Sequence, residues 1–210
     1  MSDGGGSALP DRGARLPGGY RGRLAPSPTG FLHLGHARTF WTAWERARQH
    51  AGTLVLRNED LDAARCRRVY VEAMIEDLRW LGVCWEEGPD CGGPHAPYEQ
   101  SRRLPLYREA LERLRCQGLV YPCSCSRQDV LRALRAPHAG EDEPVYPGTC
   151  RPENTVRSPS RTPAARASWR FHVPDGQAVR FVDGAAGPQT FVAGVDFGDF
   201  IVWRHDDLPS

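Results

Sequence analysis

The chain has 210 residues, 40% of them apolar and 25% charged, and 27 basic against 26 acidic residues leave a formal net charge of +1. This composition is typical of a folded, water-soluble domain with a smaller partner domain, and it excludes a largely disordered chain. The near-zero charge excludes a global electrostatic attraction to nucleic acid, so local patches must hold any such partner.

The first predicted elements are a strand, a turn and a helix. Residues 1–20 are rich in Gly, Ser, Pro and Arg without any period, which predicts a disordered lead-in. Residues 22–25 are a predicted strand. The run 26–30 (PSPTG) is a predicted turn, because prolines remove backbone donors and favour extended or turn geometry. Apolar side chains at three- and four-residue spacing then predict an amphipathic helix over 37–50.

The next predicted elements are a buried strand and two further helices. Residues 53–57 are apolar and β-prone, and the acidic run 59–62 follows them. Apolar periodicity predicts helices over 71–82 and 101–118, the second with Ser101 as its N-cap. Alternating strands and helices predict an α/β fold with a Rossmann-like parallel sheet, whose ligands gather at the carboxyl ends of the strands. Three tryptophans at helical spacing are predicted core residues: Trp41, Trp44 and Trp80.

The pattern changes after residue 120. A short helix is predicted to begin at Ser126, with Asp129 completing a capping box, and a Pro/Gly-rich loop follows it. Residues 151–167 are a predicted linker. Alternating apolar residues from Ser168 onwards predict β-hairpins, and a last strand is predicted over 200–203.

A short motif at the start of the first helix carries the strongest chemical signal. The loop 25–30 leads into His33-Leu-Gly-His36, so two imidazoles stand at a helix N-terminus, where free N–H groups and the helix dipole favour phosphate. Gly35 would let a ligand approach the backbone, and histidines three residues apart can face one ligand. The motif suits a nucleoside triphosphate, although alone it fits solvated or helix-capping histidines equally well.

The wider context of this motif resembles a known enzyme family. Residues 22–30 (GRLAPSPTG), the His-Leu-Gly-His motif and residues 56–62 (LRNEDLD) are together similar to the class I glutamyl-tRNA synthetases. The resemblance runs from about Gly22 to the end of the chain. Further stretches resemble a shortened branch of that family, the glutamyl-Q tRNA(Asp) synthetases: 87–90 (EGPD), 92–98 (GGPHAPY), 121–127 (YPCSCSR) and 146–151 (YPGTCR).

The resemblance implies an activity and its residues. It implies an enzyme that condenses L-glutamate with ATP, as its Mg²⁺ complex, to glutamyl-adenylate and passes glutamate to queuosine in the anticodon of tRNA(Asp). His33 and His36 would be the catalytic residues, acting by positioning and charge neutralisation. The implied ATP-binding residues are Thr29, Gly30, His33, Gly35 and His36. The implied glutamate-binding residues are Arg23, Leu24, Ala25, Pro26, Ser27 and Glu59.

Two of the implied glutamate ligands also make chemical sense individually. Arg23 offers a planar fork that can bind a carboxylate through two hydrogen bonds, and Glu59 offers an anion for the α-ammonium group. Both lie at strand ends that are expected to converge. The alternative is that Arg23 and Glu59 form a surface ion pair with no role in binding.

The cysteines indicate a cellular compartment and a second candidate site. Seven cysteines form an odd count, no apolar run follows the Gly-rich start, and none reaches membrane-spanning length. We therefore expect a cytoplasmic chain with no membrane partner, in which close cysteine pairs are metal ligands rather than disulfides. Cys123, Cys125 and Cys150 would need one more ligand to close a tetrahedral zinc site.

The fourth ligand is open from chemistry alone. His138 and Asp142 are the conventional candidates, whereas the resemblance implies Tyr146, four residues before the last cysteine. The resemblance further implies one structural Zn²⁺ per chain, stiffening an inserted acceptor-stem subdomain. The alternative is a set of buried free cysteines without metal.

The end of the chain departs from the family pattern. Relatives continue with a tyrosine and an arginine for glutamate and a lysine loop for ATP, whereas this sequence ends at Ser210 and contains no lysine. We expect a C-terminally truncated, monomeric enzyme that is inactive as it stands. The alternatives are the N-terminal part of a glutamyl-tRNA synthetase charging tRNA(Glu) and a non-catalytic zinc- and tRNA-binding remnant. Asn58 replaces a usually apolar residue and is expected to alter the packing behind Glu59.

The expected organisation has four parts: 1–20 as a disordered lead-in, 21–120 as a Rossmann-like nucleotide-binding half, 121–195 as a zinc-bearing insertion with a β-rich segment, and 196–210 as an incomplete return strand.

Overall fold

The structure is a computed structural model that describes residues 19–133, 145–155 and 167–210. The chain divides into two compact units, Met1–Arg103 and Leu104–Ser210. Within the described ranges, no helix has both the length and the apolar character needed to cross a bilayer. The predicted lead-in up to residue 18 and most of the predicted linker lie outside the described residues, and the domain boundaries expected from the sequence remain predictions.

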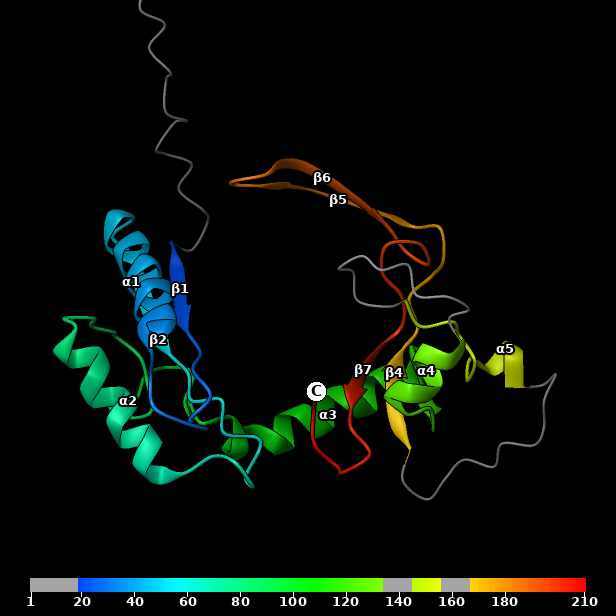
Figure 1. The fold of residues 1–210 in the computed structure, drawn as a ribbon, viewed down its shortest axis with the longest axis horizontal. Coiled ribbons are helices and arrows are strands. Elements are labelled where there is room, and N and C mark those ends of the chain that lie inside the picture. Colours follow the sequence, from blue (N-terminus) through cyan, green and yellow to red (C-terminus); the bar gives the residue numbers. More distant parts are fainter. Residues whose placement is uncertain (1–18, 134–144, 156–166) are drawn as a thin grey trace, which may run out of the picture. The chain divides into compact units, whose positions relative to one another are not determined.

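The first unit is built on parallel strands covered by helices. Strand β1 (Arg21–Leu24) pairs in parallel with β2 (Thr53–Leu56), and helix α1 (Leu34–Gln49) connects them and packs on both (Figure 1). Helix α2 (Arg68–Trp80) follows β2. A further parallel bridge joins Val55 to Glu87, which continues the parallel pattern beyond β2. The predicted parallel α/β arrangement is confirmed.

The core of the first unit lies between these strands and helices. Alternate residues along β1 and β2 are buried, as expected for strands with one face against helices. Helix α2 ends as predicted, because Gly82 adopts a φ of +78°, which lets the chain leave the helix in the left-handed conformation. The buried apolar residues are Leu24, Phe40, Ala47, Leu54, Leu56, Met74, Leu78 and Val83.

The prediction that three tryptophans belong to the core is wrong for two of them. Trp44 packs against the core, but Trp41 is 44% and Trp80 84% exposed. Trp80 follows the buried Leu78 by two residues, which places it about 200° around the helix, on the face opposite the core. The position of a tryptophan relative to the buried residues of its helix therefore predicts its burial better than its spacing from other tryptophans.

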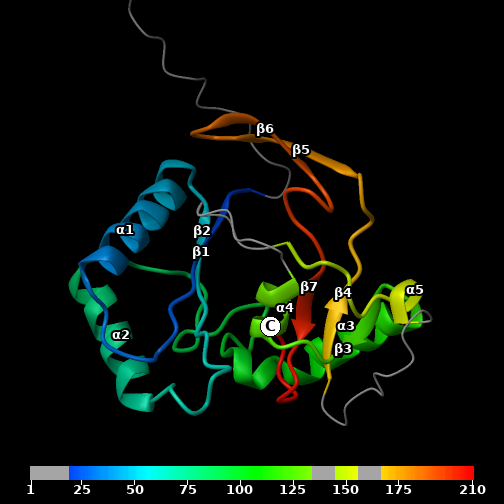
Figure 2. The ribbon, with the colours of Figure 1, turned by 45° about the vertical axis from the view of Figure 1, so that its right-hand side comes forward.

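In its described residues, the second unit combines a three-stranded antiparallel sheet, a hairpin and three helices. The sheet has the order β3 (Val120–Cys123), β4 (Ser168–Phe171), β7 (Phe200–Trp203), and α3 (Leu104–Cys116) lies along it (Figure 2). Leu111 of α3 packs with Val120 of β3 and Trp203 of β7. The described elements of this unit are α3 (Leu104–Cys116), β3 (Val120–Cys123), α4 (Arg127–Ala133), α5 (Pro152–Thr155), β4 (Ser168–Phe171), β5 (Ala178–Asp183), β6 (Gly187–Val192) and β7 (Phe200–Trp203).

The predicted strands of the second unit were right in part. The last strand is confirmed as β7, and β5 and β6 form a hairpin. The strand beginning at Ser168 is not part of a hairpin, because its partners are β3 and β7, far away in sequence. Strand β3 was not predicted, since it is short and contains Pro122.

Two predicted helix starts had different outcomes. Ser126 and Asp129 do form a capping box at α4, where the Ser126 N–H donates to Asp129 at 2.8 Å and the Asp129 N–H donates to the Ser126 hydroxyl at 3.2 Å. Ser101 is not the N-cap of α3, which begins only at Leu104 after the 3₁₀ turn Gln100–Arg103. Instead, the Ser101 N–H and hydroxyl donate to the Asp60 carboxylate at 2.8 and 2.7 Å.

Candidate functional site

The loop between β1 and α1 is held against the end of β2 by main-chain hydrogen bonds. The Arg57 N–H donates to the Leu24 carbonyl at 2.8 Å, and the Glu59 N–H donates to the Pro26 carbonyl at 3.1 Å. The two strand ends therefore converge, as the sequence predicted. Because the loop backbone is anchored in this way, Ser27 and Glu59 lie close together while both residues keep access to solvent.

The two histidines of the motif are paired by their own hydrogen bonds at the start of α1. His33 is the N-cap: its Nδ1 accepts from the Gly35 N–H at 3.2 Å, and its own N–H donates to Nδ1 of His36 at 3.3 Å. The rings lie 3.8 Å apart between centroids. Since both Nδ1 atoms accept, the neutral rings carry their proton on Nε2, which is left to donate to a ligand.

The electrostatic setting keeps His36 neutral at physiological pH. Partial burial and the nearby His33 both lower the pKa of His36 below its ordinary value. Gly35 also has a structural reason to be glycine, because a Cβ there would lie 3.0 Å from Cε1 of His33. The absence of a side chain at this position therefore leaves room for the His33 ring.

The acidic residues after β2 have separate partners. Glu59 forms an ion pair with Arg57, and Asp60 caps the turn at Ser101. Arg23 is exposed and forms no salt bridge with a carboxylate in the described part of the chain, so the alternative of an Arg23–Glu59 pair is not what the structure contains. Arg23 thus has its guanidinium available for a ligand.

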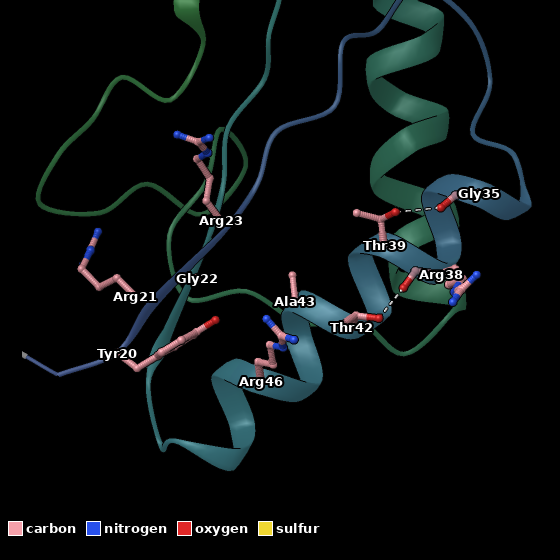
Figure 3. Close-up of a pocket in the computed structure, with 10 residues that line it drawn as sticks. All are labelled: Tyr20, Arg21, Gly22, Arg23, Gly35, Arg38, Thr39, Thr42, Ala43 and Arg46. Atoms are coloured by element: carbon pink, nitrogen blue, oxygen red, sulfur yellow. Dashed lines mark hydrogen bonds between the residues drawn. The ribbon is translucent and has the colours of Figure 1, made fainter. Parts of the chain in front are cut away.

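A cationic cleft opens between β1 and α1. It has a volume of about 750 Å³ and contains the predicted site residues Arg23 and Gly35. Figure 3 shows Arg21 and Arg23 extending from β1 and Arg38 and Arg46 extending from α1. The remaining lining residues are Tyr20, Gly22, Thr39, Thr42 and Ala43.

The charge of this cleft is largely uncompensated. Arg21 binds Glu87 through two hydrogen bonds of 2.7 and 3.0 Å, but Arg23, Arg38 and Arg46 form no salt bridge with a carboxylate among the described residues. Arg38 and Arg46 were not singled out from the sequence. The available signal was their spacing of eight residues, which places both on one face of α1.

Asn58, the residue directly before Glu59, is buried. It is 3% exposed, and its main chain exchanges hydrogen bonds with the segment after Tyr98: its N–H donates to the Tyr98 carbonyl at 2.9 Å and its carbonyl accepts from the Gln100 N–H at 3.0 Å. Its side-chain oxygen has no hydrogen-bond partner within the described part of the chain. The main-chain bonds fix the position of the adjacent Glu59.

Three cysteines and a tyrosine converge in the second unit. The sulfurs of Cys123, Cys125 and Cys150 all lie within 4.8 Å of one another, and those of Cys125 and Cys150 are 3.5 Å apart. The Tyr146 hydroxyl lies 3.4 Å from the Cys123 sulfur and 3.5 Å from the Cys125 sulfur. The other two candidates for the fourth ligand position, His138 and Asp142, lie outside the described residues.

These distances fit a tetrahedral ion. With Zn–S bonds of about 2.3 Å, the edges of a tetrahedron of ligands are about 3.8 Å long. The Cys125–Cys150 sulfur separation of 3.5 Å and the oxygen–sulfur separations of 3.4 and 3.5 Å are close to this value. All three cysteines are free of disulfides. The Cys150 N–H donates to the Tyr146 hydroxyl at 3.0 Å, which orients an oxygen lone pair towards the cysteines.

One cysteine of the cluster, Cys150, loses its proton more easily than an ordinary thiol, which favours metal binding. Burial raises the pKa of the Cys150 thiol, but hydrogen bonds from Tyr146 and the Ser124 main chain outweigh it and lower the value to about 7. Burial raises the pKa values of Cys125 and Tyr146. Ionising these two groups would therefore require a compensating cation.

A buried charge network supports this cluster, and the sequence analysis did not identify it. Asp199 accepts hydrogen bonds from Arg151 at 2.7 and 2.9 Å, from the Val173 N–H at 2.9 Å and from the Tyr121 hydroxyl. Burial alone would raise the pKa of Asp199, but these hydrogen bonds lower it. Arg151 directly follows Cys150, so the network ties the cysteine loop to β3 and β7.

The fold and both sites define a family. Residues 20–210 match the family model "tRNA synthetases class I (E and Q), catalytic domain", and the chain belongs to this family.

Individual relatives carry the names of two of its branches. The chain is 50% identical to a glutamyl-Q tRNA(Asp) synthetase of Symbiobacterium thermophilum and 47% identical to one of Nitratidesulfovibrio vulgaris, over 89% and 90% of its length. A glutamate-tRNA synthetase structure from Elizabethkingia anophelis matches with a TM-score of 0.74 at 27% identity, covering 91% of this chain and 40% of that one. The chain spans 58% of the length of each of the two curated relatives.

Proposed function

We propose that this chain is the glutamate- and ATP-binding front part of an enzyme that forms glutamyl-adenylate and transfers glutamate to queuosine in tRNA(Asp). The observation that carries the proposal is the histidine pair at the start of α1, whose Nε2 atoms are left to donate beside a cationic cleft. The identity of about half to glutamyl-Q tRNA(Asp) synthetases supports this branch of the family.

The chemistry assigns a role to each part of the site. A carboxylate oxygen of glutamate attacks the α-phosphorus of ATP, a P–O bond forms to give the acyl-adenylate, and the bond to pyrophosphate breaks. Negative charge develops on the phosphate oxygens, and preorganised donors from His33 and His36 stabilise it. Arg23 binds a carboxylate of glutamate, Glu59 its ammonium group, and Mg²⁺ bound with ATP offsets the phosphate charge.

Most of the remaining predicted residues act through the main chain. Leu24 ends β1, and Ala25, Pro26, Thr29 and Gly30 shape the loop that follows it. Ser27 in this loop offers its hydroxyl to glutamate. We place the enzyme in the cytoplasm, where tRNA substrates of this family are found.

We further propose that Cys123, Cys125, Tyr146 and Cys150 hold one structural Zn²⁺. The separations between their ligand atoms support this set. The ion would cross-link the end of β3 to the loop before α5, and no step of glutamate activation passes through it.

The test is exchange of labelled pyrophosphate into ATP by the complete reading frame to which this chain belongs. Exchange should require glutamate but no tRNA. Labelled glutamate should then appear on tRNA(Asp) that contains queuosine, including tRNA(Asp) from which the 3′-terminal adenosine has been removed. Queuosine-free tRNA(Asp) is the control and should accept no label.

The structural match to a glutamate-tRNA synthetase makes 3′-end charging the second candidate. Exchange that requires tRNA(Glu), with label lost on removal of its 3′-adenosine, would establish that candidate instead. A protein that binds tRNA and zinc but gives no glutamate-dependent exchange would contradict both and identify a binding module.

A further inference from the structure

Arg170 of β4 is a buried cation beside the cysteine cluster. It is 8% exposed, its Nε–H donates to the Cys123 sulfur at 3.2 Å, and its Nη1–H donates to the Asp199 carbonyl at 3.1 Å. Its guanidinium carbon lies 3.9 Å from the centroid of the Tyr146 ring. One side chain therefore contacts two of the four proposed metal ligands without being a ligand itself.

The charge of Arg170 is not balanced by a carboxylate side chain within the described residues. Its hydrogen bond to Asp199 goes to the main chain, whereas the Asp199 carboxylate is taken by Arg151 and Tyr121. A buried guanidinium needs a counter-charge, because an unpaired charge is costly to desolvate. The cysteine cluster is the anionic partner that the geometry provides.

The charge count of the metal site calls for such a cation. A divalent ion bound by three thiolates and a neutral phenol carries a net charge of −1, and a phenolate would make it −2. Buried thiolate sites are stabilised by N–H donors to sulfur, and the partners of the ligands fix their orientation. Arg170 supplies a full positive charge, an N–H bond to sulfur and a stacking contact on the tyrosine ring together.

We propose that Arg170 is the positioning residue of the cysteine site: it neutralises the anionic metal–thiolate cluster and holds Cys123 and Tyr146 in ligating geometry. The proposal rests on the zinc site proposed above. It implies that Arg170 sets both the affinity for the ion and the involvement of Tyr146 in its coordination.

The first test measures metal affinity in the full chain. Zn²⁺ dissociation constants come from competition with a chromophoric chelator for the wild type, Arg170→Met and Arg170→Lys. Arg170→Met should weaken binding by about 10- to 100-fold, the usual effect of losing a partner of a metal ligand, and Arg170→Lys should recover part of the loss because it keeps the charge.

A matched control comes from helix α3, which packs near the same strand as Arg170. Arg115 stacks over Trp169 of β4, with 4.4 Å between its guanidinium carbon and the ring centroid, and among the described residues no hydrogen bond joins it to Cys123, Cys125 or Cys150. Arg115→Met should leave the dissociation constant within about twofold. An Arg170→Met chain that binds Zn²⁺ as tightly as the wild type would overturn the proposal.

The second test is spectroscopic and reports on the ligands directly. In Co²⁺-loaded protein, Arg170→Met should shift the thiolate charge-transfer band and the visible bands, because Cys123 and Tyr146 lose their support. A merely structural role would lower thermal stability without changing these bands. Unchanged bands at full Co²⁺ occupancy would contradict the assignment.

A third test needs no variant, so it remains decisive if Arg170→Met fails to fold. In wild-type protein loaded with ¹¹³Cd²⁺, the Arg170 Nε–H proton should show a scalar coupling to cadmium through the Cys123 sulfur. Absence of that coupling in the bound state would overturn the proposal. A wild-type chain that binds neither Zn²⁺, Co²⁺ nor Cd²⁺ would refute both the metal site and the proposed role of Arg170. The proposed glutamate activation would be unaffected, because glutamate-dependent pyrophosphate exchange tests it independently.

Discussion

The two candidate sites hold their polar side chains in opposite ways. In the first unit, Arg23, Ser27 and His33 are exposed, and main-chain hydrogen bonds of the loop position them. In the second unit, Tyr146 and Asp199 are buried and held by other side chains. A substrate site must remain open, whereas a structural site must exclude water. Substitutions in the first site should therefore alter activity at little cost in stability, and those in the second should do the reverse.

The largest effect should come from Asp199→Ala. The side chain is fully buried, and its removal leaves Arg151 and Tyr121 without their shared acceptor. We expect a loss of about 3–5 kcal/mol in the free energy of unfolding, measured by urea denaturation.

The control is Asp175→Ala, because Asp175 also pairs with Arg151 but is 58% exposed. It should cost at most about 1 kcal/mol. Equal losses in the two variants would show that burial of the acceptor is not what matters here.

Removal of metal should destabilise the second unit and leave the first unit unaffected. With free Zn²⁺ about a thousandfold above its dissociation constant, bound ion contributes about 4 kcal/mol of stability. Chelation should therefore increase amide hydrogen exchange, followed by mass spectrometry, around Cys123 and Cys150. Peptides from β1 and α1 should keep their protection. Uniform loss of protection would mean that the ion supports the whole chain.

His36→Ala should impair catalysis with little effect on stability. In the complete enzyme, we expect glutamate-dependent pyrophosphate exchange to fall by about 10²- to 10³-fold, as for loss of one preorganised donor to a developing anion. The helix loses a capping contact, so stability should fall by only about 1 kcal/mol. His50→Ala, at the other end of α1, is the control and should exchange at the wild-type rate; a slow His50→Ala enzyme would point to a general effect on the helix.

The ion pair between Arg21 and Glu87 should make stability depend on pH. Hydrogen bonds from Arg21 and Tyr98 lower the pKa of Glu87 from 4.5 to about 2. Because the folded-state pKa is depressed, its contribution is fully present above about pH 4.5 and is lost as the pH falls towards about 2. The free energy of unfolding, measured by urea denaturation between these pH values, should change less steeply with pH for Glu87→Gln than for the wild type. Parallel slopes would exclude Glu87 as the titrating group.

The smallest effect should come from the helix cap at α4. Ser126→Ala removes the hydroxyl that accepts the Asp129 N–H, and it should cost about 1 kcal/mol. Ser126→Asp restores an acceptor and should recover most of the loss in thermal denaturation. If Ser126→Ala unfolds at the same temperature as the wild type, the cap does not contribute to the stability of this unit.

The sequence by itself determined the elements whose signals are local. Periodic apolar residues predict the helices α1 and α2 and the parallel strands β1 and β2. Single residues within a few positions predict the left-handed end of α2 at Gly82 and the capping box at Ser126. The pairs His33 with His36 and Cys123 with Cys125 were also visible, because their members lie within three positions of each other in the sequence. Cys150 lies 25 residues beyond Cys125, and the structure brings their sulfurs together.

Only the tertiary structure decided which distant residues meet. Partners such as Arg170 with Cys123 and Arg151 with Asp199 are 47 and 48 residues apart in sequence, and no local pattern links them. The same holds for β4, which pairs with β3 and β7 rather than with β5, the strand that follows it in the chain. Local signals fix the backbone of each element. The cost of burying a charge, in contrast, is offset only when the folded chain brings a counter-charge into contact with it.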